Sequence, residues 1–217
     1  LNAKKIKTQK VPVVFEAPVA STIIKCFLAG IRGSNQYRKS TFLLDHMGKQ
    51  VFPEHISITE DPLMKGGMGS TSFDGDGVAC SKKFFVENGV VSNYVLSVYS
   101  ARKLGMKPTG NAGGARNVEI THTEGDLANL LAKMGTGFLV TELMGQGVSI
   151  VTGDYSQGAA GFWVENGVIQ YPVSGVTIAA NLRDMFKGIV SVAGDIDKRR
   201  NILTGSILLD EMMVAGQ

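Results

Sequence analysis

The sequence has little of what builds disulfide scaffolds or zinc sites. It contains two cysteines, Cys26 and Cys80, and three histidines, His46, His55 and His122. Two cysteines are too few for a disulfide framework, which favours a reducing compartment, so we expect a cytoplasmic protein. No two histidines have the helical spacing of an HExxH or HExxxH motif, so the chain presents no zinc-site motif of its own.

Long apolar runs are also missing. No stretch reaches the length of a membrane span, and the basic start LNAKKIKTQK lacks the apolar run of a signal peptide. The net charge of +3 arises from 22 basic and 19 acidic residues, and neither the start nor the basic run at 197–201 has interleaved aromatics. We therefore expect no membrane and no nucleic-acid partner, and we interpret both basic runs as solvated surface.

Glycine, by contrast, is abundant, with 27 residues. In residues 141–181, glycines recur every few positions within sequence that favours β-strands. The same block contains no obvious group of catalytic residues. Glycine in a strand marks bulges, sharp bends or a close approach of another backbone, so this block indicates either a shaped binding surface or a sharply curled sheet. The loop at 65–77, KGGMGSTSFDGDG, lacks the GK[ST] ending of a phosphate-binding loop and is interpreted as an ordinary glycine-rich loop.

A short internal sequence repeat predicts two hairpins. Residues 84–94 read FFVENGVVSNY and residues 162–171 read FWVENGVIQY, each with Asn-Gly between β-branched or aromatic runs. Asn-Gly favours a tight hairpin because both turn positions need positive φ. The repeat indicates either a duplicated unit or the same turn chemistry used twice.

Helical periodicity completes the outline. Pro18 starts a predicted helix that runs to about Gly30, and shorter helices are predicted at 97–104, at 127–134 between Thr123 and Gly135, and at 182–189 after Asn181. Tight hairpins without regular β-α-β alternation predict an α+β fold with a curved, largely antiparallel β-sheet. No internal linker divides the chain, so we expect a single domain over 1–217.

Isolated reactive side chains offer weak alternatives. Cys80 lies beside two lysines, which lower a thiol pKa, but without a nearby histidine a buried, inert thiol is the preferred interpretation. Asp74, Asp76 and Asp154 lie near glycines as in calcium loops, yet the closing Glu of that pattern is absent. We interpret these aspartates as turn residues.

Longer segments carry a family resemblance. They are YRKSTFLLD (37–45), SFDGDGV (72–78), YSARKLGMKPTGNAGG (99–114), TELMGQGVSIVTGDYSQGAAGFWVENGVIQYPV (141–173) and the closing VAGQ (214–217). Together they resemble the C-terminal domain of the TldD/PmbA family, and within it the PmbA (TldE) branch. The resemblance spans almost the whole chain. It implies, as does a start at Leu1 rather than methionine, a longer protein whose N-terminal half is absent here.

The resemblance also implies a function. In this family a TldD-type and a PmbA-type subunit form a cytoplasmic heterodimer, a zinc-dependent peptidase that degrades unfolded peptides or processes leader peptides, including that of microcin B17. We therefore expect an oligomer with a TldD-like subunit as partner, extended or unfolded peptides as substrates, and zinc in the partner.

Catalytic residues cannot be transferred to this chain. The catalytic branch of the family holds zinc with HExxxH on an early helix and a late cysteine. The corresponding helix here, at 22–33, has Lys25, Cys26 and Arg32 but no histidine, and Thr204 stands where the cysteine is expected. We expect a non-catalytic subunit without a metal site. The alternatives are a metallopeptidase with ligands outside this chain and a peptide-binding scaffold without protease activity.

The glycine-rich block supplies the predicted substrate or partner surface. Its glycines interrupt strand-forming sequence, where an open strand edge receives an extended peptide by backbone pairing. Relief of crowding inside the sheet is the alternative reason for these glycines. The predicted surface comprises Gly145, Gly147, Gly153, Asp154, Tyr155 and Ser156.

Overall fold

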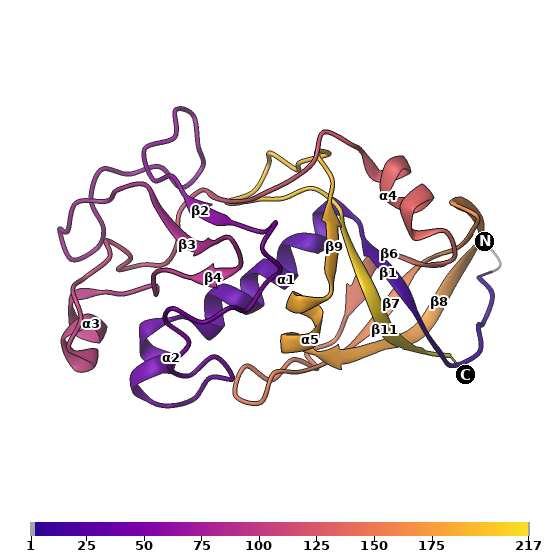
Figure 1. Ribbon diagram of the computed structural model, residues 1–217, viewed down its shortest axis with the longest axis horizontal. Coiled ribbons are helices and arrows are strands. Elements are labelled where there is room, and N and C mark those ends of the chain that lie inside the picture. Colours follow the sequence, from indigo (N-terminus) through magenta and orange to yellow (C-terminus); the bar gives the residue numbers. More distant parts are fainter. Residues whose placement is uncertain (1–2, 217) are drawn as a thin grey trace.

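The computed structural model describes residues 3–216 and arranges them as two sheets with a long helix, α1, between them (Figure 1). The larger sheet contains β1 (Gln9–Phe15), β6 (Gly137–Met144), β7 (Asp154–Glu165), β8 (Val168–Asn181), β9 (Ile189–Val192) and β11 (Ile207–Ala215). The smaller contains β2 (Ile58–Glu60), β3 (Lys83–Glu87), β4 (Val90–Val91), β5 (Val118–Ile120) and β10 (Ile202–Leu203). The helices are α1 (Ala17–Gly30), α2 (Gly33–Tyr37), α3 (Val98–Leu104), α4 (Leu127–Met134) and α5 (Leu182–Lys187).

The larger sheet closes on itself. Strand β1 pairs in parallel with β6 and antiparallel with β11, so β1, β6, β7, β8 and β11 form a barrel-like ring, and β9 pairs with β11. The smaller sheet has the order β10-β5-β2-β3-β4 and is antiparallel except between β10 and β5. The predicted α+β fold with a curved, largely antiparallel sheet is confirmed.

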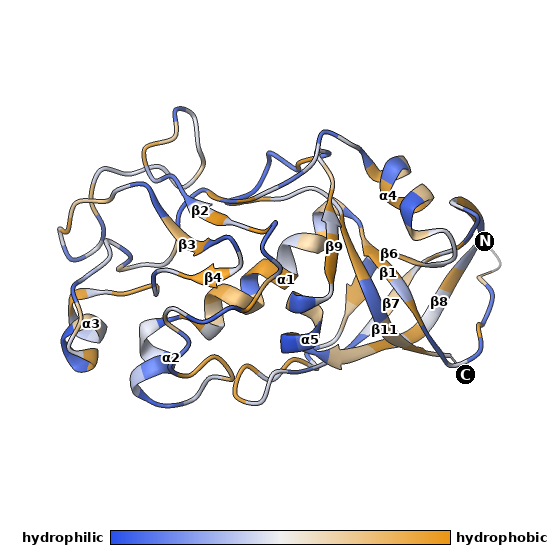
Figure 2. Ribbon diagram, in the orientation of Figure 1, coloured by the Kyte–Doolittle hydropathy of each residue, from blue (hydrophilic) through white to orange (hydrophobic). Residues whose placement is uncertain are grey.

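Helix α1 joins the two sheets through a shared core. Pro18 lies in its first turn, where the missing N–H costs nothing. Its apolar residues recur every three or four positions, and the helix is mostly orange and pale in Figure 2. The fully buried side of the helix carries Ala20, Ile23, Ile24 and Phe27, each 0% exposed. They belong to one hydrophobic cluster that includes residues of both sheets.

Both predicted hairpin turns form. Asn88 and Gly89 have φ of 48° and 83°, and Asn166 and Gly167 have φ of 49° and 76°. These positive values are what a two-residue hairpin turn with right-handed strand twist requires. The left-handed Gly105 ends α3, which confirms another predicted boundary.

Two predicted helix boundaries were wrong. Asp126, not Thr123, caps α4, because the Asp126 carboxylate accepts from the Asn129 N–H while the Thr123 hydroxyl donates to the Val192 carbonyl. Helix α5 begins after Asn181 as predicted but ends at Lys187, and Ile189 opens β9. Within residues 3–216, no helix combines the length and apolar character that crossing a membrane requires.

Candidate functional site

A groove follows the exposed side of α1. Three adjoining hollows of about 230, 240 and 140 Å³ make it up, and neighbouring hollows share lining residues such as Lys25 and Arg32. We call it the α1 groove. Its helix side is Ser21, Lys25, Leu28, Ala29, Arg32, Ser34 and Tyr37, and its opposite side is Val95, Ser97, Tyr99, Ser100 and residues 111–115 and 200–202.

Helical spacing explains the helix side. Lys25 and Leu28 are three positions apart, so they lie on one face of α1, opposite the buried apolar residues. Arg32 follows the end of α1, has extended backbone before α2, and lines the same hollow. Both cations are exposed, and neither makes an ion pair within residues 3–216. No aspartate or glutamate lines the groove. Lys25 and Arg32 therefore leave the groove positively charged.

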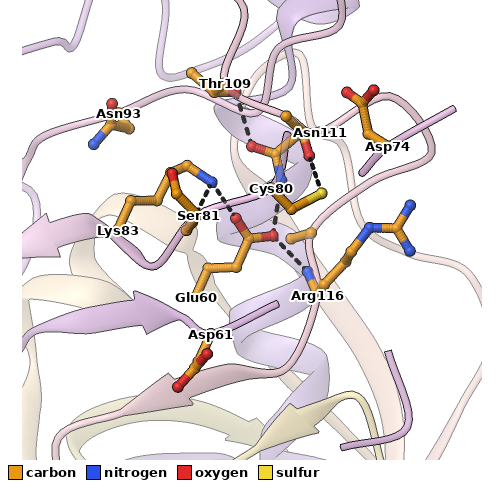
Figure 3. Close-up of polar contacts among 12 residues, drawn as sticks. Glu60, Asp61, Asp74, Cys80, Ser81, Lys83, Asn93, Thr109, Asn111 and Arg116 are labelled. Carbon is orange, nitrogen blue, oxygen red and sulfur yellow. Dashed lines mark hydrogen bonds and ion pairs between the residues drawn. The ribbon is translucent and has the colours of Figure 1, made fainter. Parts of the chain in front are cut away.

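The opposite side is held by a buried carboxylate (Figure 3). Glu60 is 1% exposed and lies at the end of β2. Its Oε1 accepts from Asn111 Nδ2 at 2.8 Å and from the Arg116 N–H at 2.6 Å, and its Oε2 accepts from Lys83 Nζ at 2.6 Å. A buried charge is tolerated when it is paired and hydrogen-bonded in this way. Glu60 thus fixes the segment at 111–116 that lines the groove.

Asp74 fixes the same segment from another side. Its carboxylate accepts from the backbone N–H groups of Asp76, Val78 and Ala112, each at 2.9 Å. Burial alone would raise the pKa of Asp74, but these three hydrogen bonds and the charge of Arg116 hold it below the ordinary value. Asp74 is therefore an ionised turn residue.

Residues near the C-terminus complete the groove. Asn201 donates from Nδ2 to the Ala115 carbonyl at 2.9 Å and accepts from the Asn117 N–H at 2.6 Å. It precedes β10, the edge strand of the smaller sheet. Arg200 is held by Asp197, with Nε and Oδ2 3.0 Å apart.

The early helix and the residues just before β10 both line this groove, and their side chains do not suit zinc. Lys25 of α1 and Arg32, which follows α1, line the same hollow as Asn201. Thr204 is buried outside the groove lining, with its hydroxyl donating to the Gly205 carbonyl. Zinc is bound by Cys, His, Asp or Glu. No group of three or more such residues within 3–216 is placed to hold a metal.

Neither thiol is placed as a nucleophile. Burial raises the pKa of Cys26 to about 11, so this thiol stays protonated at neutral pH. Cys80 is buried, and its Sγ donates to the Gly110 carbonyl at 3.4 Å, in agreement with the preferred interpretation of an inert thiol.

The residues of the predicted surface at 145–156 are held together by backbone hydrogen bonds between the two ends of this segment. Gly147 accepts from the Ser156 N–H at 2.7 Å, and the Ser149 N–H donates to the Asp154 carbonyl at 2.8 Å. Strand β8 pairs with the other side of β7, so Asp154–Ser156 has no open backbone edge. The close approach at Gly147 is therefore to Ser156 of the same sheet, as the crowding alternative predicts.

The remaining residues of this surface differ in access. Gly145 and Gly153 have positive φ, of 92° and 84°, which glycine adopts without strain. Asp154 and Ser156 are exposed, whereas Tyr155 is 2% exposed and points into the core. A role of the exposed residues in contacting a substrate or partner stays a prediction.

Sequence reasoning missed the α1 groove. Its lining comes from segments about 80 positions apart along the chain, which no local pattern connects. One signal was available: Lys25 is the only charged residue within the largely apolar α1, and Arg32 follows soon after the helix ends.

Comparison with known proteins gives the family. Residues 8–216 match the family model of the PmbA/TldA metallopeptidase C-terminal domain. The Metalloprotease PmbA homolog of Haemophilus influenzae is 54% identical and Metalloprotease PmbA of Escherichia coli O157:H7 is 51% identical, each over 217 residues. These alignments cover 100% of this chain and 48% of each relative. The chain thus spans about half the length of these relatives.

A solved structure agrees with the sequence match. The crystal structure of a proposed modulator of DNA gyrase from Bacteroides thetaiotaomicron superimposes with a TM-score of 0.95 at 26% identity. The superposition covers 100% of this chain and 49% of that one. The resemblance inferred from the sequence motifs is confirmed, and the chain belongs to the PmbA/TldA metallopeptidase C-terminal domain family.

Proposed function

We propose that this chain is part of a PmbA-type subunit that does not hold the catalytic zinc itself. It would act with a TldD-like subunit that carries the metal, in a cytoplasmic peptidase that degrades unfolded peptides or processes leader peptides of the microcin type. The observation that carries the proposal is the hollow that Lys25 and Arg32 line together with Asn201 and Ile202, because its lining contains two cations and no metal ligand.

The charge at this position argues against a cation. Two exposed side chains with fixed positive charge repel Zn²⁺, and the lining supplies no carboxylate to offset them. The walls of the groove are nevertheless well ordered by the Glu60 and Asp74 hydrogen bonds. A preorganised groove without catalytic groups suits a subunit that helps to enclose a peptide.

The test separates this proposal from its alternatives. The full-length protein and its TldD-like partner are purified alone and together, and each sample is assayed for zinc by elemental analysis and for cleavage of an unfolded peptide. We expect zinc to follow the partner and cleavage to require both proteins.

Other outcomes identify the alternatives. One tightly held zinc in the full-length protein alone, with cleavage, would establish a metallopeptidase whose ligands lie outside residues 1–217. Peptide binding without assembly or cleavage would establish a scaffold instead. Substituting the partner's metal ligands is the control, because it should abolish cleavage while assembly persists.

A further inference from the structure

The charged side chains that line the α1 groove are all positive. Lys25, Arg32 and Arg200 contribute three cations to its lining, and no carboxylate lines it. Arg200 is already paired with Asp197, but Lys25 and Arg32 have no ionic partner within residues 3–216. The unpaired charges favour an anionic ligand.

Backbone donors accompany these charges. The N–H groups of Gly113 and Ala115 donate no hydrogen bond within the described chain, and both residues line the groove. Next to them on the same side of the groove, Asn201 donates to the Ala115 carbonyl and leads into β10, the edge strand of its sheet. Free main-chain donors beside an edge strand are what an extended peptide uses to bind.

Two aromatic residues line one end of the groove. Tyr37 and Tyr99 contact each other edge to face, with ring centroids 5.8 Å apart. Arg38 lies 5.7 Å from the centre of the Tyr37 ring, and Lys103 lies 5.6 Å from that of Tyr99. Single-stranded nucleic acids bind by stacking bases on open aromatic faces. Tyr99 remains 60% exposed, so an oligonucleotide is included below as a rival ligand.

We propose that the α1 groove binds an extended peptide segment through its aspartate or glutamate side chains. Lys25 and Arg32 pair with the carboxylates, while the Gly113 and Ala115 N–H groups donate to carbonyl oxygens of the peptide backbone. Lys25 and Arg32 line the same hollow, so two nearby acidic residues of one extended peptide reach both cations. The inference rests on the proposed function only in that it names the class of peptide this subunit handles.

A binding experiment tests the inference on the full-length protein. Fluorescence anisotropy at low salt compares a short labelled peptide that has glutamate at alternate positions and a C-terminal amide with the same peptide carrying glutamine. We expect the glutamate peptide to bind at least about fivefold more tightly, and added salt to weaken it. Equal affinity for the two peptides would overturn the proposal.

Matched variants locate the site. K25Q/R32Q should lower the affinity for the glutamate peptide by roughly tenfold, whereas K49Q/K133Q removes two exposed cations outside the groove and should leave it unchanged. An equal loss of affinity in both variants would show that overall charge, rather than the α1 groove, determines binding, and would overturn the proposed site. Charge reversal in K25E/R32E should transfer the preference to a lysine peptide.

The remaining measurements test other ligands for the groove. They also distinguish failure of this inference from failure of the proposed function. A glutamine peptide with a free C-terminal carboxylate that matches the glutamate peptide would assign the groove to chain ends and overturn the side-chain proposal. Tighter binding of a single-stranded oligonucleotide, lost in K25Q/R32Q, would overturn it in favour of nucleic acid. Assembly with the TldD-like subunit is measured separately, so its failure refutes the proposed function without affecting the peptide result.

Discussion

Asn111 lies against Glu60, and its side-chain amide donates to the buried carboxylate at 2.8 Å. The two residues are 51 positions apart, and their contact ties the lining of the α1 groove to the end of β2. Lys83 pairs with the other carboxylate oxygen at 2.6 Å. The shape of the groove thus depends on a buried polar network in which both carboxylate oxygens of Glu60 have partners.

We predict that Glu60→Ala lowers the free energy of unfolding by about 3 kcal/mol, because it leaves the Lys83 ammonium and the Asn111 amide without their buried partner. Glu211→Gln is the control, since Glu211 pairs with Lys10 at 3.7 Å on the surface. It should cost less than about 0.5 kcal/mol. Urea denaturation measures both variants, and equal, small changes would show that the Glu60 network does not stabilise the fold.

Asp74 should make stability depend on acidity. Its folded-state pKa is depressed, so its contribution is fully present above the unfolded pKa of about 3.9 and is lost as the pH falls through the folded value. At neutral pH, Asp74→Asn should cost about 2 kcal/mol because the charged acceptor of three N–H groups is lost. Denaturation curves across the acid range should show the two proteins converging below about pH 4. A constant difference down to about pH 2 would contradict this role.

The turn glycines allow strain and crowding to be separated. Gly89 and Gly48 both have positive φ, of 83° and 73°. A Cβ on Gly89 would overlap the Phe52 carbonyl oxygen, whereas a Cβ on Gly48 would have no atom within 4 Å. Both alanine variants carry a backbone strain of about 1 kcal/mol. Gly89→Ala should lose a further 1 to 3 kcal/mol or so from overpacking. Indistinguishable unfolding midpoints would show that the chain relieves the contact at Gly89.

Local chemistry accounts for the parts of the fold that were predictable. The Asn-Gly turns and the start of α5 after Asn181 follow from side chains and φ preferences within a few residues. Closure of the barrel was not predictable in this way, because it pairs β1 with β11 at the opposite end of the chain. The buried role of Glu60 was equally unpredictable from the sequence. A glutamate before Asp-Pro has the pattern of a surface turn, and only the fold brings its partners to it.

The Gly147 contact provides the last prediction. This glycine has no positive φ, so alanine suits its backbone, but a Cβ would overlap the carbonyl oxygen of Ser156. Gly147→Ala should therefore destabilise the start of β7 and lower the free energy of unfolding by about 2 kcal/mol. Gly75 is the control, because its Cβ would lie 3.5 Å from the Ala112 carbonyl oxygen, an ordinary contact. Thermal and urea unfolding compare the two variants. If Gly147→Ala is as stable as Gly75→Ala yet impairs peptide cleavage by the assembled complex, the glycine serves ligand approach rather than packing within the sheet.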